Sequence, residues 1–143
     1  MSEPYAKMIT SSTDRTEMLN QVAITLQPND EAFVEFFDVG KSYDMLSDRV
    51  GGMIECVHIG EGIDMWVNEN FIQEQLDYNA TASGIYWSVF GFNAGFILGN
   101  VVFTSSDGMG ETIGLNVDQI NHLKKIAFDF CGIVPDLRES YVL

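Results

Sequence analysis

The sequence predicts an α+β fold, a mainly antiparallel sheet with two or three helices in a single compact domain. The chain has 143 residues, about the length of one domain. Its 46% hydrophobic and 12% aromatic content is far above that of a disordered acidic chain. Pairs of predicted strands separated by helices imply a mainly antiparallel sheet, and no internal repeat or Pro/Ser-rich linker divides the chain. We therefore expect one domain over residues 21–135, a loose arm over 1–20 and a C-terminal tail over 136–143.

The first half of the chain combines two strands with a short helix. Alternating apolar and polar residues predict a strand over 22–26, and residues 32–39 are predicted to form another. Ser42 can cap a helix that stops at the glycine pair 51–52. The residues of this helix that face inward are Met45, Leu46 and Val50.

The next segment predicts a β-hairpin. Residues 53–59 and 63–67 flank the turn Gly60-Glu61-Gly62, whose glycines suit a tight reversal. Because side chains alternate along a strand, Cys56 and His58 lie on one face. We expect His58 to be partly buried there.

Residues 84–103 carry no charge over about twenty residues, which is also the length of a membrane span. No Lys or Arg flanks the segment, and Asn93 and Asn100 fall inside it. Glycine with β-branched and aromatic residues favours strands instead. We therefore predict two buried strands, 85–90 and 96–104, joined by a glycine-containing turn.

The last predicted helix begins at Asn116, with Gln119 as its capping-box partner. Gly132 and Pro135 end it and leave the tail. Its apolar stripe consists of Ile120, Leu123, Ala127 and Phe130.

The charge excludes several classes of function. The chain has 21 acidic and 7 basic residues, a formal net charge of -14, and no Lys or Arg between Arg49 and Lys124. Nucleic-acid binding requires a basic stripe, and anionic membranes attract basic segments, so direct contact with either is disfavoured. A basic protein partner remains open.

Known chemical motifs are weak or absent. Cys56 and Cys131 lack metal-ligand or redox spacing, which favours two buried free thiols in a reducing cytoplasm. The N-terminal residues lack the apolar core of a secretory signal. The glycines of 108–114 are spaced unlike a dinucleotide fingerprint, and neither His58 nor His122 adjoins a nucleophile motif. Oxygen-bearing residues over 64–70 lack the order of a calcium loop. We expect no cofactor and no metal.

A set of short motifs carries a family resemblance. A VGG-x-IE run over 50–55, an NE pair at 68–69, a lone Asn79 and a GN-VV run over 99–102 follow one another. This succession resembles a family of small proteins of unknown function encoded by bacteriophages and plasmids. The resemblance covers roughly residues 31–125 and implies a phage accessory protein without an assigned activity. The same residues also fit structural roles in turns and close packing.

We compare three functions, and an enzyme ranks below them all. The leading hypothesis is a non-catalytic protein that binds a basic host protein in the host cytoplasm, for host takeover or anti-defence, through a surface that imitates nucleic acid. The predicted acidic face consists of Glu61, Asp64, Glu69, Glu74 and Asp77. The alternative is a pocket that sequesters a small ligand or nucleotide signal by aromatic stacking. That pocket would be lined by Trp66, Tyr86, Trp87, Phe90 and Phe92. A third hypothesis is a homo-oligomer joined through exposed aromatic residues.

Overall fold

The computed structural model describes residues 21–131 and 136–140, and in them all strands join one sheet. The expected arm over 1–20 lies outside the described residues. The strands are β2 (Gln21–Leu26), β3 (Glu31–Phe37), β4 (Ile54–His58), β5 (Ile63–Asn68), β6 (Val101–Ser106), β7 (Thr112–Ile113) and β8 (Asp136–Ser140).

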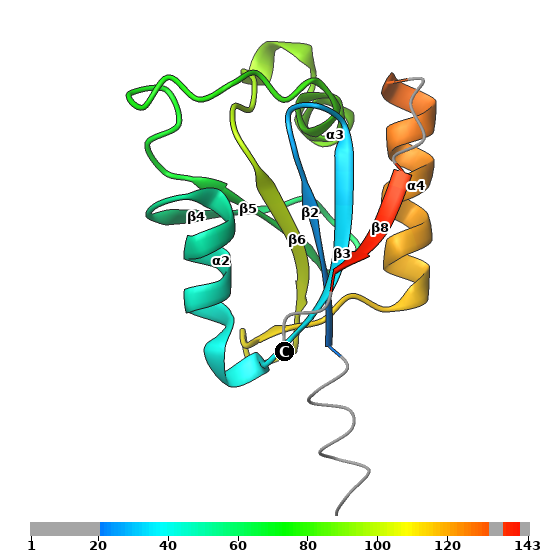
Figure 1. Cartoon of the computed structure of the whole chain (residues 1–143). Coiled ribbons are helices and arrows are strands. Elements are labelled where there is room, and N and C mark those ends of the chain that lie inside the picture. The colour runs from blue at the N-terminus through cyan, green and yellow to red at the C-terminus, as the bar shows by residue number, and fades with distance from the viewer. Residues whose placement is uncertain (1–20, 132–135, 141–143) are drawn as a thin grey trace, which may run out of the picture.

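The sheet has the spatial order β4-β5-β6-β2-β3-β8, and the short β7 pairs with the end of β6 (Figure 1). Every pairing is antiparallel except that of β3 with β8. β4 therefore forms one edge of the sheet and β8 the other. Residues 136–140, predicted from the sequence to belong to a C-terminal tail, form β8 and are part of the sheet.

Three α-helices are described: α2 (Ser42–Val50), α3 (Ala80–Phe90) and α4 (Val117–Cys131). Short 3-10 turns, η1 (Val39–Lys41) and η2 (Phe92–Ala94), lie beside α2 and α3. α3 and α4 pack together on one face of the sheet, and α2 covers part of the other face (Figure 1).

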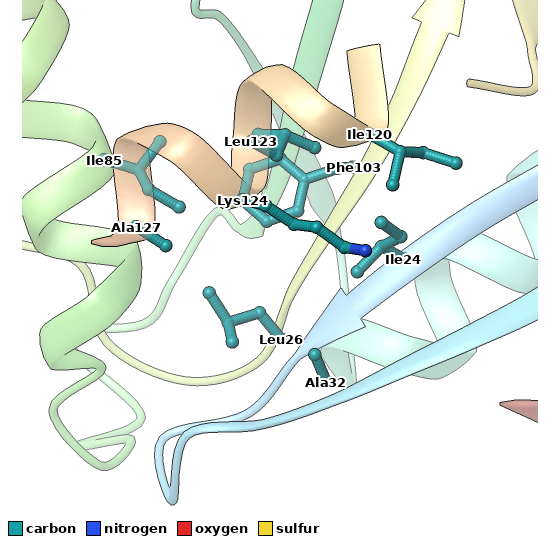
Figure 2. A pocket seen from close by; sticks show the side chains of 9 residues that line it. All are labelled: Ile24, Leu26, Ala32, Ile85, Phe103, Ile120, Leu123, Lys124 and Ala127. Atoms are coloured by element: carbon teal, nitrogen blue, oxygen red, sulfur yellow. The ribbon is translucent and has the colours of Figure 1, made fainter. Parts of the chain in front are cut away.

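The main core lies between the sheet and the α3–α4 pair. Ile24 and Phe103 of the sheet pack there with Ile85 of α3 and Leu123 of α4. A small apolar cavity of about 20 Å³ remains beneath α4, with the stem of Lys124 along its wall (Figure 2). It is about the size of one water and almost wholly apolar, so it is a packing void and not a ligand site.

The α2 face of the sheet is more polar than the α3–α4 face. A smaller apolar cluster under α2 contains Leu46 and Val50. Strand alternation places further side chains of the α2 face in a row that is at most 4% exposed. This row consists of Thr25, Glu35, Asp64, Asn68 and Thr104. Buried polar groups need partners, and every member of the row except Thr25, whose Oγ1 has no hydrogen-bond partner among the described residues, makes a polar side-chain contact.

The structure confirms the α+β fold, the first two strands, the hairpin, α2 and α4. The predicted cap of α2 is wrong, because Ser42 is the first residue of the helix and the N-cap position is Lys41, without a side-chain capping bond. Asn116 and Gln119 form the expected capping box, with Gln119 N donating to Asn116 Oδ1 at 2.8 Å and Asn116 N donating to Gln119 Oε1 at 3.0 Å. Ile120 is half-buried, Leu123 and Ala127 are buried, and the side chain of Phe130 lies outside the described residues.

The predicted strand over 85–90 is wrong, because these residues belong to α3. The helix is apolar on nearly every side, so its sequence lacks the 3.6-residue periodicity that separates a helix from a buried strand. Asn79 caps the helix through a bond from Ala82 N to its Oδ1. Within the described residues, no helix combines the length and the apolar character that a membrane crossing requires.

Candidate functional site on the α2 face

A partly buried ion pair fixes the side of α2 that faces β3. Arg49 donates from Nε and Nη2 to the two carboxylate oxygens of Glu35 at 2.6 and 2.7 Å, and it also pairs with Asp48. The hydrogen bond to Glu35 raises the pKa of Arg49 above its usual value. Glu35 is only 3% exposed, so this guanidinium neutralises a carboxylate that burial would otherwise disfavour.

Asparagine side chains secure the C-terminal end of α2. Asn68 Nδ2 donates to Val50 O at 3.2 Å, and Asn100 Nδ2 donates to Arg49 O at 3.0 Å. The last carbonyls of a helix lack partners within it, so these amides, from the end of β5 and from the residue before β6, satisfy them. Gly51 ends the helix in the left-handed region, with φ 79°. These motif residues therefore have structural roles, as their turn chemistry predicts.

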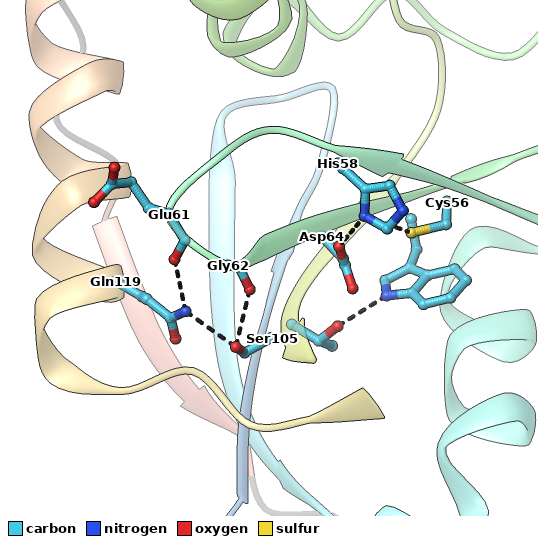
Figure 3. A network of polar contacts seen from close by, with 9 residues as sticks. Cys56, His58, Glu61, Gly62, Asp64, Ser105 and Gln119 are labelled. Carbon is cyan, nitrogen blue, oxygen red and sulfur yellow. Dashed lines mark hydrogen bonds and ion pairs between the residues drawn. The ribbon is translucent and has the colours of Figure 1, made fainter. Parts of the chain in front are cut away.

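A second set of contacts fixes the β4–β5 hairpin against α4. Gln119 Nε2 donates to Glu61 O at 2.9 Å and to Ser105 Oγ at 3.0 Å, while Ser105 Oγ donates to Gly62 O at 2.9 Å (Figure 3). The turn is thereby tied to the capping box of α4. The turn end of the hairpin is therefore anchored to both α4 and β6.

The hairpin carries a cluster of three chemically different side chains. His58 and Asp64 are direct cross-strand partners, and Cys56 lies two residues from His58 on the same face. His58 Nδ1 lies 2.6 Å from Asp64 Oδ1 and 3.9 Å from Cys56 Sγ (Figure 3). One potential metal-ligand atom from each of the three side chains, a sulfur, a ring nitrogen and a carboxylate oxygen, lies within 4.8 Å of the other two.

Burial differs sharply within this cluster. The side chain of Asp64 is 6% exposed, whereas that of His58 is 79% exposed on the edge strand. The expectation that His58 is partly buried is therefore wrong, because no strand covers the outer side of β4 among the described residues. Beside Asp64 along β5, Trp66 Nε1 donates to Thr104 Oγ1 at 2.8 Å.

The same cluster is unsuited to nucleophilic catalysis. Burial, followed by the charge of Asp64, raises the pKa of the Cys56 thiol to about 12, whereas an active thiolate needs a lowered pKa. Cys56 and Asp64 also meet the same ring nitrogen of His58. A catalytic triad uses the two ring nitrogens separately, one for the nucleophile and one for the carboxylate.

The predicted acidic residues do not form one patch. Glu69, Glu74 and Asp77 are exposed near the start of α3, whereas Glu61 is exposed in the hairpin turn at the opposite end of β5. Eight residues of extended chain span roughly 26 Å. Asp64 is buried beside His58 and takes no part in an exposed face.

The predicted aromatic residues are also divided. Trp66 packs in the cluster under α2, whereas Tyr86 packs against the core on the other face of the sheet. Tyr86 pairs with Phe90 at a ring-centroid distance of 4.9 Å, and Trp87 pairs with Phe92 at 5.5 Å. Four of the five residues therefore lie on α3 and η2, whereas Trp66 lies on the opposite face of the sheet. The five residues do not line one pocket.

A groove beside Tyr86 includes none of the other predicted pocket residues. Its volume is about 270 Å³. Its walls come from β4, β5, α3, the end of η2 and the segments before α3 and after η2. Its aromatic lining consists of Phe71, Tyr86 and Phe96. The sequence did not indicate this groove, because the fold of the loop on either side of α3 creates it.

These features define a single α+β domain with one apolar, helix-covered sheet face and one polar face that carries a Cys–His–Asp cluster. The chain belongs to the family described as Domain of unknown function (DUF3846), whose model matches residues 20–127. The matched range contains every motif residue of the resemblance and the whole cluster. Neither a curated protein nor a solved structure matches the chain.

Proposed function

We propose that this protein is a non-catalytic binding protein whose acidic surface engages a basic protein partner. One observation carries the proposal: every Asp and Glu between residues 50 and 123 is exposed except Asp64, and this stretch contains no Lys or Arg. A surface with one sign of charge attracts a partner of the opposite sign and accelerates the encounter.

Six of these eight exposed carboxylates form two groups at opposite ends of the sheet. The first group lies near the start of α3 and consists of Glu69, Glu74 and Asp77. The second group lies near the hairpin turn and the start of α4 and consists of Glu61, Glu111 and Asp118. Roughly 26 Å separates the two ends, so a partner that contacts both must present an extended basic surface.

A protein that binds nucleic acid has such an extended basic surface. The resemblance to phage and plasmid proteins supports a host protein as the partner, in the host cytoplasm. The proposed class of partner is therefore a nucleic-acid-handling or defence factor of the host, whose basic site the protein would occupy.

The test compares three forms of the intact chain against partners captured from bacterial lysate at low salt. One variant neutralises the first group with Glu69→Gln, Glu74→Gln and Asp77→Asn. A matched variant neutralises the second group with Glu61→Gln, Glu111→Gln and Asp118→Asn. Calorimetry then gives the affinity of each purified partner at several salt concentrations. Duplex DNA is added as a competitor.

We expect the affinity to fall as salt rises and at least one variant to bind about tenfold more weakly. Three exposed charges at about 0.5 kcal/mol each contribute about 1.5 kcal/mol, which corresponds to about tenfold in affinity. Displacement of the partner by DNA would support imitation of nucleic acid. An affinity that is independent of salt and equal for all three forms would refute the proposal.

The groove beside Tyr86 favours a second candidate, binding of a small ligand. Its volume is close to the lower end of the range of ligand pockets. Thermal-shift measurements against nucleotides and nucleosides test it, with Tyr86→Leu as the altered form and Tyr43→Leu, at an exposed tyrosine of α2 outside the groove, as the matched control. A stabilising ligand should lose its effect only with Tyr86→Leu. The absence of any stabilising ligand for the native chain would reject this candidate.

A further inference from the structure

Three donor atoms of the hairpin converge on one point. Cys56 Sγ, His58 Nδ1 and an oxygen of Asp64 lie within 4.8 Å of one another. In a tetrahedral zinc site, the bond lengths to sulfur, nitrogen and oxygen place the ligand atoms about 3.4–3.6 Å apart. The 3.9 Å between Sγ and Nδ1 is close to this spacing, and the 2.6 Å between Nδ1 and Oδ1 must widen slightly.

The scaffold allows this small adjustment. His58 is 79% exposed on an edge strand, so its ring can turn without disturbing the core. Asp64 is held in the interior of the sheet, and the turn beside it is tied to Gln119. One fixed ligand and one adjustable ligand on a rigid hairpin are suited to capture of an ion.

The identity of the ligands selects the class of metal. A thiol, an imidazole and a carboxylate together suit zinc and similar divalent transition metals, whereas calcium and magnesium prefer oxygen ligands alone. Because Asp64 is nearly fully buried, a cation beside it offsets the cost of burying its charge. The strongly negative chain also raises the local concentration of cations.

We propose that Cys56, His58 and Asp64 bind one divalent transition-metal ion of the zinc class, with water in the fourth position. The ion replaces the contact between His58 and Asp64, so the proton that Nδ1 carries in this contact leaves to solvent and the ring keeps its proton on Nε2. The thiol proton of Cys56 also passes to solvent as the sulfur–metal bond forms. His58 binds through Nδ1, the ring nitrogen that faces both neighbours. The site is independent of the acidic surface proposed above.

The experiment uses the full reduced chain, freed of metal by a chelator, in excess Mg²⁺ to saturate the exposed carboxylates. Zn²⁺ is titrated by calorimetry. Co²⁺ is titrated in parallel and followed by its visible bands and by the near-ultraviolet band of a cobalt–thiolate bond. We expect one ion per chain, a tetrahedral Co²⁺ spectrum and a thiolate band.

Variants of each ligand have matched controls elsewhere in the chain. The most informative pair is His58→Gln with His122→Gln, because the exposed His58 contributes little to folding. Cys56→Ser is compared with Cys131→Ser, and Asp64→Asn with Asp118→Asn. Circular dichroism checks that each variant is folded.

We expect each ligand variant to bind Zn²⁺ at least tenfold more weakly, since loss of even an indirect support costs 10- to 100-fold. The three controls should bind as the native chain does. Zn²⁺ should also raise the melting temperature of the native chain and of the controls, but not that of His58→Gln. A Co²⁺ complex without a thiolate band, or unchanged Zn²⁺ affinity in His58→Gln, would overturn the proposal.

Discussion

Asn79 connects three elements of the fold, and its removal should be unusually costly. The side chain is fully buried. Its Oδ1 accepts from Ala82 N at 3.0 Å, which caps α3. Its Nδ2 donates to Leu26 O at 3.1 Å and to Gly99 O at 2.9 Å, which joins the end of β2 and the segment before β6. A single amide therefore secures the start of α3 to the sheet.

The cost of Asn79→Ala follows from these three bonds. Loss of a helix cap costs about 1 kcal/mol. Each buried carbonyl that loses a donor adds about 1–2 kcal/mol, because burial prevents water from replacing the amide. The expected total is about 3–5 kcal/mol, a large part of the roughly 5–15 kcal/mol that stabilises a domain.

Urea unfolding of the native chain and the variant measures this difference. Asn116→Ala is the matched control, because Asn116 also caps a helix but is exposed. Its loss should cost only about 1 kcal/mol. The difference between the two variants isolates the two interior donations of Asn79. Equal losses of stability in the two variants would refute the reasoning.

Asn79→Asp adds a dependence on pH to the same test. The substitution keeps the acceptor for Ala82 N but directs carboxylate oxygens at the carbonyls of Leu26 and Gly99. Burial and repulsion should raise the folded-state pKa of the new carboxyl above its unfolded value of about 4. The loss of stability relative to the native chain should therefore be largest at pH 7 and shrink as pH falls toward 4. A loss that does not change between pH 7 and pH 5 would contradict this account.

Two further predictions concern the sheet and its polar face. Gly114→Ala places a Cβ 2.4 Å from a backbone nitrogen at the start of β2, so we expect a loss of at least about 2 kcal/mol in thermal unfolding. Gly108→Ala, which meets nothing within 4 Å, is the control and should be nearly neutral. Arg49→Met leaves the buried carboxylate of Glu35 without its cation and should cost about 3 kcal/mol in urea unfolding. Lys41→Met removes an exposed charge and should change stability by less than about 0.5 kcal/mol.

Local signals predicted much of the fold. The alternation over 22–26, the glycine turn over 60–62 and the capping box at Asn116 each specify an element within a few residues. The helix α3 was missed because its apolar sequence contains no periodic signal, and burial on nearly all sides decides its conformation. The available signal was Asn79, a strong capping residue directly before a run of small residues.

The Cys–His–Asp cluster could have been predicted from the hairpin alone. Ile59 and Ile63 close the turn, with Ile59 N donating to Ile63 O at 3.1 Å, so the next pair outward is His58 with Asp64. Alternation then places Cys56 on the same face. The exposure of His58 was not predictable in this way, because it depends on which strand forms the edge of the sheet. That order is set by contacts between distant parts of the chain.

The acidic surface and the Cys–His–Asp cluster are separable by experiment because they share no residue. The two charge-neutralised forms keep all three proposed metal ligands, so they should bind Zn²⁺ at the same site as the native chain. His58→Gln keeps every exposed carboxylate, so it should retain the salt-dependent affinity for a basic partner unless the ion itself contributes a contact. Partner binding can be measured with and without Zn²⁺. If His58→Gln bound the partner normally without Zn²⁺ but lost the additional affinity that Zn²⁺ gives the native chain, a group of the partner would fill the fourth position of the metal in place of water. The polar face of the sheet would then be part of the interface with the partner. The two acidic groups proposed above lie at the ends of the sheet, outside this cluster.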